Sequence, residues 1–310
     1  MTAAPIRIAI VGVGKIAVDQ HLPAIAANPD FTLAATVSPN HPGFAETPHF
    51  KTLDALFASD VAVDAVALCT PPQVRYDLAA QSLARGTHVF LEKPPGATLS
   101  EVAALVAEAE ASSATLFASW HSRYAAGVEP ARAWLADRKI ERVLITWRED
   151  VRVWHPGQAW IWEPGGLGVF DPGINALSIA THILPKPFFL TEALLELPEN
   201  RAAPIAADLR FRDTAGADIV MDLDWRQTGP QSWDILVDTD RGQLALAKGG
   251  SVLTLPDGTQ HLEEREYPGL YERFAHLIRD GESDVDVAPM RLVADAFLRG
   301  RRESVEAFHD

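Results

Sequence analysis

Cysteine and long apolar runs are almost absent from this 310-residue sequence. The one cysteine, Cys69, excludes an internal disulfide, and its position after the apolar run 65–68 indicates a buried, unreactive thiol. A membrane-spanning helix needs about 20 apolar residues, and a secretory leader needs a basic segment before an apolar one. The sequence shows neither pattern, so we expect a cytoplasmic location, a reducing environment and no membrane partner.

Positive charge is also scarce. The chain has 27 Lys and Arg residues against 42 Asp and Glu residues, which gives a net charge of -15. Nucleic acids and anionic membrane surfaces are polyanions that would repel such a chain, so neither is expected as a partner. With 47% hydrophobic residues the chain can bury large cores. Its length exceeds the size at which one core usually stops growing, so about two domains are expected.

The clearest motif lies at the N-terminus. An apolar run, residues 6–11, leads directly into Gly12-Val13-Gly14-Lys15-Ile16-Ala17. In this GxGxxA pattern the first glycine permits a tight turn, the second lets the backbone approach a pyrophosphate, and the small third residue allows helix–strand packing. A helix beginning near Lys15 would point its amide groups at the phosphates. The segment therefore predicts a site for a nicotinamide or flavin dinucleotide.

Strand and helix patterns alternate over the first 120 or so residues, which predicts a doubly wound parallel sheet of the Rossmann type. The predicted strands after the first are 31–37, 64–69, 88–91 and 114–119, and the predicted helices are 53–57, 73–85 and 99–111. From about residue 143 strand patterns follow one another across Gly, Asp and Pro turns, which predicts an open, mainly antiparallel sheet. These strands are 206–212, 218–225, 233–238 and 243–247, with helices near 267–279 and 289–307 after them.

These patterns predict two domains of different class. Residues 1–121 are expected to form the α/β dinucleotide-binding domain. Residues 122–310 are expected to form an α+β domain for substrate binding and oligomerisation, whose terminal helix can pack back on the first domain.

Ligands of an open parallel sheet bind outside the carboxyl ends of its strands. The second, third and fourth strands are followed by Ser38-Pro39-Asn40-His41, Thr70-Pro71-Pro72 and Glu92-Lys93-Pro94-Pro95. No Asp or Glu follows the second strand to bind a ribose 2′-hydroxyl, and no Arg is there to clamp a 2′-phosphate, so the choice between NAD and NADP stays open. The predicted cofactor contacts are Gly12, Gly14, Lys15, Ile16, Ser38, Thr70, Pro71, Glu92 and Lys93.

The fourth strand end is the candidate position for chemistry. A lysine beside a bound nicotinamide can hold a substrate oxygen and exchange a proton with it, which is the role we consider for Lys93. A solvated lysine at a strand end, followed by prolines that stop strand pairing, is the competing interpretation. The residues alone leave both open.

A second candidate region follows the glycines at 165–168. Asp171 before Pro172 has the form of a helix N-cap with proline at the first helical position, and the helix can run to about residue 184. Asp171 and Asn175 would then lie one turn apart on one face. A role as helix N-cap would by itself account for Asp171 without any catalytic function. It would not account for the presence of Asn175 on the same face of the helix.

The third candidate region is rich in tryptophan. Four Trp residues occur between 147 and 162, among carboxylate, imidazole and amide side chains. Flat aromatic faces beside such groups suit a carbohydrate, whose ring has apolar C–H patches and a rim of hydroxyls. Packing in an aromatic core is the alternative, and we assign at most two of these residues to a site.

Taken together, these motifs resemble the Gfo/Idh/MocA oxidoreductase family across essentially the whole chain. The likeness rests on residues 12–17, Thr70-Pro71-Pro72, Glu92-Lys93-Pro94 and the Asp171-x-x-x-Asn175 segment. The resemblance implies that Lys93 contacts cofactor and substrate. In that family an Asp and a His four residues later complete the acid–base group, but here Asn175 stands at the His position. An amide does not titrate near neutral pH, so proton removal would fall to Asp171 or Lys93.

Within that family the segments 121–124, 154–162 and 170–177 resemble the bacterial aldose 1-dehydrogenases that act on D-galactose and L-arabinose, which share this Asn. The resemblance implies hydride transfer from the anomeric carbon to NAD or NADP, giving an aldonolactone. It implies that Lys93 polarises the anomeric oxygen, that Asp171 acts as base or tunes Lys93, and that Asn175 orients the sugar. The candidate substrate contacts are Lys93, His121, Glu149, Trp154, His155, Asp171, Asn175 and Trp233.

Other functions remain open at this point. A polyol or inositol dehydrogenase, or a keto-sugar reductase, would use the same family features. A redox-sensing NAD(P)-binding regulator without turnover belongs to a different class, but it would not need Lys93, Asp171 and Asn175 together. No metal ion is predicted. The sheet over residues 206–255 offers a broad face for a homo-oligomer, as in related proteins.

Overall fold

The computed structural model describes residues 4–309, which form two compact units. The first unit contains the residues up to His121 together with Glu266–Asp286. The second contains Ser122–Arg265 and the residues from Val287 onward. The segment 266–286 thus groups with the dinucleotide-binding part of the chain, although it lies 145 residues beyond its neighbour His121 in sequence.

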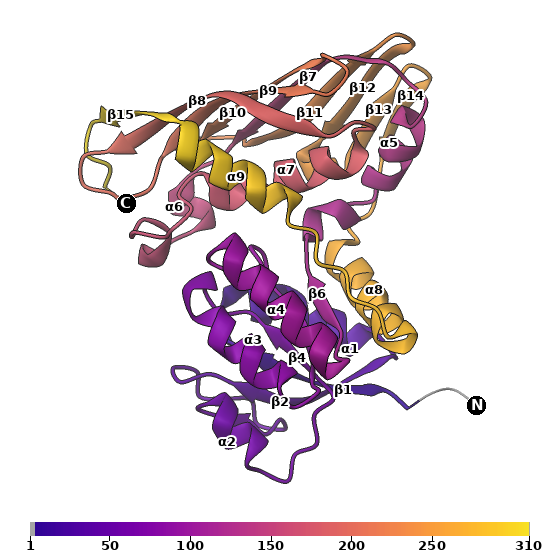
Figure 1. The fold of residues 1–310 in the computed structure, drawn as a ribbon, viewed down its shortest axis with the longest axis vertical. Helices are drawn as coiled ribbons and strands as arrows, with labels where there is room; N and C mark the ends of the chain where they lie inside the picture. The colour runs from indigo at the N-terminus through magenta and orange to yellow at the C-terminus, as the bar shows by residue number, and fades with distance from the viewer. Residues whose placement is uncertain (1–3, 310) are drawn as a thin grey trace. The chain divides into compact units, whose positions relative to one another are not determined.

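The first unit is built on a six-stranded parallel sheet with the order β3-β2-β1-β4-β5-β6 (Figure 1). Its strands are β1 (Ile6–Val11), β2 (Phe31–Val37), β3 (His49–Phe50), β4 (Ala65–Leu68), β5 (His88–Leu91) and β6 (Leu116–Ala118). The order reverses beside β1, the position at which open α/β sheets bind ligands. The central strands β1 and β4 are almost wholly buried, as expected for parallel strands covered on both faces.

Helices pack beside this sheet, and all but the last of them lie between its strands in the chain. They are α1 (Leu22–Ala27), α2 (Leu53–Phe57), α3 (Arg75–Leu83), α4 (Leu99–Ser112) and α8 (Glu266–Asp280), with a π-helical turn at Ala17–His21 and 3-10 turns at Pro72–Val74 and His121–Tyr124. Helix α3 packs against α4, and α8 packs against α1. Helix α4 begins with a capping box in which Thr98 and Glu101 bond each other's backbone N–H groups.

The second unit contains a nine-stranded sheet with the order β14-β13-β12-β11-β7-β10-β9-β8-β15 (Figure 1). Its strands are β7 (Ile140–Arg148), β8 (Phe188–Pro198), β9 (Ala206–Asp213), β10 (Asp218–Asp224), β11 (Ser232–Thr239), β12 (Gly242–Ala247), β13 (Val252–Leu255), β14 (Gly258–His261) and β15 (Arg301–Val305). Neighbouring strands are antiparallel except for the pairs β7–β10 and β8–β15.

Helices cover one face of this sheet. They are α5 (Val128–Leu135), α6 (Val151–Trp154), α7 (Phe170–Ile183) and α9 (Ala288–Arg299), with 3-10 turns at Ala159–Ile161 and Lys248–Gly250. Helix α7 is buried along nearly its whole length and packs against both α5 and α9. Along β9, Leu209 and Phe211 are buried while Arg210 and Arg212 are exposed, so the sheet has one covered and one open face.

The predicted fold class is confirmed, and the predicted strands all form. The terminal helix is shorter than predicted, because Gly300 leaves the helical conformation after Arg299 and the chain continues as β15 beside β8. A Cβ at Gly300 would lie 2.5 Å from the carbonyl oxygen of Ala296, so glycine is required there. Strands β3, β7, β8, β13, β14 and β15 are not among the predicted ranges.

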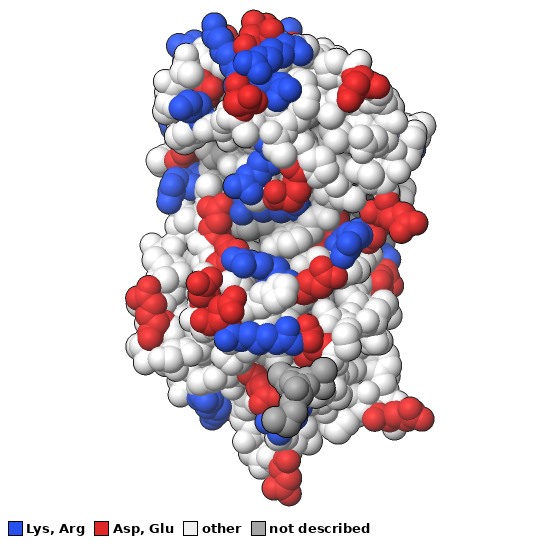
Figure 2. Space-filling view, turned by 90° about the vertical axis from the view of Figure 1, so that its right-hand side faces the viewer, with Lys and Arg blue, Asp and Glu red and all other residues white. Residues whose placement is uncertain are grey.

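Charges of both signs are mixed on the face of the molecule that Figure 2 shows. In Figure 2, Lys and Arg side chains lie beside Asp and Glu side chains and do not gather in an area of one sign. Ion pairs such as Arg7–Asp64 at 2.6 Å and Arg226–Glu196 at 2.8 Å reflect this arrangement. No helix within residues 4–309 has both the length and the apolar character needed to cross a membrane.

Candidate functional site

The glycine turn after β1 has the geometry that a dinucleotide requires. Gly12 has a φ of 92°, and its N–H donates to the carbonyl of Val37 at 2.8 Å. A Cβ on Gly12 would lie 2.9 Å from backbone atoms of Cys69 and Thr70. A Cβ on Gly14 would meet nothing within 4 Å, so open space borders this backbone, and Ala17 is fully buried. Gly12, Gly14 and Ala17 therefore meet the three requirements of the GxGxxA pattern: a tight turn, room for a ligand beside the backbone, and close packing of helix on strand.

The ends of β2 and β4 add polar groups at the same edge of the sheet. Ser38 follows β2, is 7% exposed, and donates its backbone N–H to Phe50 at 2.9 Å. Thr70 follows β4, and its buried Oγ1 has no hydrogen-bond partner within residues 4–309. A buried hydroxyl without a partner is costly unless a ligand or water satisfies it. The residues present thus fit a bound NAD or NADP.

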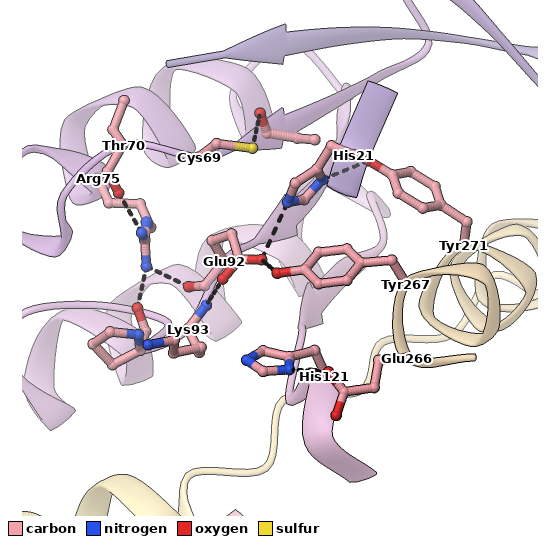
Figure 3. A network of polar contacts seen from close by, with 12 residues as sticks. His21, Cys69, Thr70, Arg75, Glu92, Lys93, His121, Glu266, Tyr267 and Tyr271 are labelled. Atoms are coloured by element: carbon pink, nitrogen blue, oxygen red, sulfur yellow. Dashed lines mark hydrogen bonds and ion pairs between the residues drawn. The ribbon is translucent and has the colours of Figure 1, made fainter. Parts of the chain in front are cut away.

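Arg75, which the sequence analysis did not single out, ties two of these strand ends together. Its guanidinium is buried and donates to the backbone carbonyls of Thr70, Glu92 and Pro94 (Figure 3). The segments after β4 and β5 are thereby held to one side chain. Nothing in the sequence marks this role, because Arg75 is simply the first residue of a helix.

The carboxylate of Glu92 lies at the centre of a buried cluster (Figure 3). Its Oε1 accepts the Tyr267 hydroxyl at 2.8 Å and lies 3.1 Å from Nε2 of His21. Its Oε2 accepts the backbone N–H of Lys93 at 2.7 Å. The Tyr271 hydroxyl lies 2.7 Å from Nδ1 of His21. The side chain predicted to touch the cofactor is therefore bonded within the protein on both oxygens.

This cluster is charged. Burial opposes ionisation of Glu92, but the hydrogen bond and the charge of His21 outweigh it and lower the pKa of Glu92 to about 2. Burial likewise disfavours a charged imidazole, while Cys69, Tyr271 and Glu92 raise the pKa of His21 well above its usual range. A buried ion pair of imidazolium and carboxylate results.

His121, a predicted sugar contact, is oriented by helix α8. Its Nδ1 lies 2.7 Å from Oε2 of Glu266, and its ring stacks on Tyr267 with centroids 5.6 Å apart. Burial disfavours the charged ring, but the carboxylate of Glu266 outweighs it and raises the pKa of His121. The imidazole thus has a fixed orientation at the end of β6.

In the second unit, an imidazole stands between two carboxylates. Nε2 of His155 lies 3.5 Å from Oε1 of Glu149, and Nδ1 lies 3.7 Å from Oδ2 of Asp171. Glu149 also accepts the indole N–H of Trp233 at 2.9 Å and that of Trp225 at 3.3 Å. Both carboxylates are buried. Four of the predicted residues are therefore brought together, and Trp225 is a participant that the sequence analysis missed.

The predicted N-cap role of Asp171 is wrong. Helix α7 begins at Phe170, and its N-cap position is occupied by Val169, with no capping side chain. The chain turns at Gly168, where φ is 54°, so the helix begins earlier than the Asp-Pro pattern indicates. Asp171 instead lies in the first turn, where the helix dipole favours a carboxylate, close to His155. Asn175 follows one turn later and is half-buried.

The tryptophans divide between core and surface. Trp147 and Trp162 are 4% exposed and belong to the core. Trp154 is 41% exposed and meets Trp233 edge to face, with ring centroids 5.0 Å apart. Packing in the core therefore accounts for Trp147 and Trp162, and a sugar contact by Trp154 stays a prediction.

Comparison with known proteins defines the class. The model of the Gfo/Idh/MocA oxidoreductase family, NAD-binding Rossmann fold, matches residues 6–119. Galactose 1-dehydrogenase of Pseudomonas fluorescens is 48% identical over 308 residues, which cover 99% of each chain. The chain therefore belongs to the Gfo/Idh/MocA oxidoreductase family, and it is an NAD(P)-dependent oxidoreductase.

Solved structures give the same result at the level of the fold. The crystal structure of D-galactose-1-dehydrogenase from Rhizobium etli is 58% identical, with a TM-score of 0.95 over 100% of this chain and 99% of that one. A 3-ketoreductase from Actinomadura kijaniata, solved with TDP-benzene and NADP, is 17% identical, with a TM-score of 0.84 over 97% of this chain and 99% of that one. The second likeness concerns the fold alone.

The buried His21–Glu92 pair makes stability depend on acid pH. The pKa of Glu92 is about 2 in the folded protein against an ordinary 4.5. The ionised Glu92 therefore contributes fully to stability when the pH is above 4.5, the ordinary pKa. This contribution is lost as the pH falls through the pKa of about 2 that Glu92 has in the folded protein. The lowering corresponds to about 3 kcal/mol. We expect Glu92→Gln to lower Tm near neutral pH, and its difference from wild type to shrink as the pH falls below the ordinary value, in thermal unfolding followed by circular dichroism.

The matched control for this experiment is Glu108→Gln, which alters a carboxylate bonded to Tyr76 at 3.2 Å in the same unit. Its Tm should stay close to that of the wild type over the same pH range. A Tm difference for Glu92→Gln that does not change with pH would contradict the charged state assigned to the pair.

Proposed function

We propose that this protein is an aldose 1-dehydrogenase that oxidises D-galactose, L-arabinose or a close relative at C1 to the aldonolactone, with NAD or NADP as hydride acceptor. The observation that carries the proposal is the full-length match to two galactose 1-dehydrogenases, at 48% and 58% identity. The two sugars are the same pyranose except at C5, where galactose bears a hydroxymethyl group, so one site can take both.

The second unit offers the side chains that a pyranose requires. Carboxylate, imidazole and amide groups from Glu149, His155, Asp171 and Asn175 suit the rim of hydroxyls, and the exposed ring of Trp154 suits the apolar C–H face. The indole N–H of Trp233 holds Glu149, so we assign Trp233 to orienting this carboxylate.

In the first unit, we assign cofactor binding to the glycine turn and the strand ends. The residues are Gly12, Gly14, Lys15, Ile16, Ser38, Thr70, Pro71, Glu92 and Lys93, of which Glu92 acts indirectly, through the Lys93 peptide that its carboxylate holds. When bound, NAD or NADP supplies the nicotinamide C4 that accepts the hydride.

We assign the proton chemistry to Lys93 and Asp171. Lys93 holds and polarises the anomeric oxygen through its ammonium group. As the C1–H bond is lost as hydride, the anomeric hydroxyl gives up its proton and becomes the lactone carbonyl. Asp171 takes this proton or tunes Lys93, since the amide of Asn175 cannot accept it. The imidazole of His155 lies beside Asp171, with Nδ1 at 3.7 Å from Oδ2.

The proposal also includes a homo-oligomer and a cytoplasmic location. The open face of the nine-stranded sheet carries half-exposed Leu144, Val220 and Leu236 side by side on β7, β10 and β11. These apolar side chains support association of two copies through this face. The low cysteine content supports a cytoplasmic location.

Substrate class is tested by NADH and NADPH formation at 340 nm with a panel of aldoses and polyols. We expect turnover with D-galactose and L-arabinose, and none with inositol or open-chain polyols, because those lack an anomeric hydroxyl. Turnover of the polyols alone would establish the polyol dehydrogenase alternative. Cofactor binding without any turnover would establish the regulator.

Lys93 is tested by Lys93→Met, which keeps the length of the side chain and removes its charge. We expect kcat to fall by about two to four orders of magnitude, the usual size of a general acid–base contribution. The affinity for NAD(P)H, measured by fluorescence titration, should change far less. The control is Lys139→Met, which alters an exposed lysine of the other unit. If Lys93→Met turned over at the wild-type rate, Lys93 would be a solvated strand-end residue.

Asp171 is tested by Asp171→Asn, which preserves shape and removes the charge. We expect Tm within a few degrees of wild type and a loss in kcat of about a hundredfold or more, since an amide cannot accept the proton. The acidic limb of the pH profile of kcat/KM should also disappear.

Asp150→Asn is the matched control for Asp171→Asn. Asp150 is the N-cap of α6 and accepts the backbone N–H of Arg152. Asn caps helices about as well as Asp, so both rate and stability should be retained. Full activity and an unaltered pH profile in Asp171→Asn would leave the base to Lys93 or solvent.

A further inference from the structure

Helix α8 inserts tyrosine side chains next to the peptide that carries Lys93. Tyr267 is 175 residues from Glu92 in sequence, yet its hydroxyl donates to Oε1 of Glu92 at 2.8 Å (Figure 3). The Tyr267 ring lies against two imidazoles, edge-on to His21 at 5.0 Å and stacked on His121 at 5.6 Å. The ring is 4% exposed. The mechanism proposed above uses neither Tyr267 nor His21.

Only one side chain separates Tyr267 from Lys93. Glu92 accepts the Tyr267 hydroxyl on Oε1, and it accepts the backbone N–H of Lys93 on Oε2 at 2.7 Å. A carboxylate is a rigid planar fork, so a group that holds one oxygen also sets the direction of the other. His21 at 3.1 Å holds the same Oε1 from a second side. The rotation of Glu92 is thereby restrained at the residue directly before the proposed catalytic lysine.

We propose that Tyr267 is a positioning residue for Lys93, acting through the carboxylate of Glu92 on the Lys93 backbone N–H. The inference rests on the proposed role of Lys93. A reacting group must be held within about 0.5 Å of its productive position, and displacements of about 1 Å can cost a hundredfold in rate. A hydrogen bond to the lysine's own peptide controls the point from which its side chain extends.

This role differs from a general contribution to stability. A stabilising contact affects every property of the folded protein alike, whereas a positioning contact matters only while the lysine it positions is present. The two can be separated by a double-mutant cycle, which measures whether the effect of one substitution depends on the other residue.

The experiment compares the wild type with Tyr267→Phe, Lys93→Met and the double variant. The number of competent sites is counted by NADPH fluorescence titration, and kcat is expressed per competent site, so that partial unfolding of a variant does not enter the rate. We expect Tyr267→Phe to lower kcat about tenfold in the wild-type background, with KM for NAD(P) little changed. In the Lys93→Met background the same change should lower kcat by less than about twofold, because nothing remains to be positioned.

The matched control is Tyr76→Phe, which removes another tyrosine–glutamate hydrogen bond of the same unit, to Glu108 at 3.2 Å. It should leave kcat unchanged in both backgrounds. An unchanged kcat in Tyr267→Phe would overturn the inference. An equal loss in both backgrounds, with Lys93→Met itself strongly impaired, would overturn it while leaving the proposed function intact. A fully active Lys93→Met would overturn the role of Lys93 and the inference with it.

Discussion

The ion pair between Glu92 and His21 is the interaction on which the candidate cofactor site of the first unit depends. Removing a carboxylate and an imidazole from water is costly, and the cost is offset only when every lone pair and proton has a partner. Here the partners come from different parts of the unit: the π-helical turn after β1, the backbone after β5, and helix α8. The pair therefore requires these parts to be assembled together.

The same principle organises the polar cluster around Glu149 in the second unit. Glu149 is buried at the end of β7, and two indole N–H groups bind its oxygens from β11 and from the residue after β10. Because each indole has a single donor, this bonding fixes the direction of the carboxylate. His155 then lies between Glu149 and Asp171. A preorganised set of polar groups suits the recognition of one arrangement of hydroxyls.

The two units present different kinds of groups. The parallel sheet presents strand ends and a glycine turn, the features with which open α/β sheets bind dinucleotides. The open sheet presents a cluster of large polar and aromatic side chains, which suits a variable substrate. Family membership and full-length similarity to galactose 1-dehydrogenases agree with both.

Local rules were sufficient for much of the molecule. The GxGxxA turn, the strand at 31–37 and the helix at 53–57 were predictable because their signals, a glycine pair or a periodic pattern, depend only on neighbouring residues. Lys93 and Asp171 were identified as candidates from motifs of three to five residues. The two-residue strand β3 and strand β15 were missed, since each forms only because a partner strand offers it hydrogen bonds.

Only the tertiary structure decided what surrounds these residues. Asp171 has the sequence pattern of a cap, but the turn at Gly168 starts the helix earlier and leaves the carboxylate beside His155. Arg75 and Tyr267 carry no local signal at all, because their partners are carbonyls and a carboxylate brought close by chain folding. Sequence by itself determined the class of fold, the cofactor turn and the identity of the titratable groups. Their orientation and charge depend on contacts between segments up to 250 residues apart, which no periodic pattern encodes.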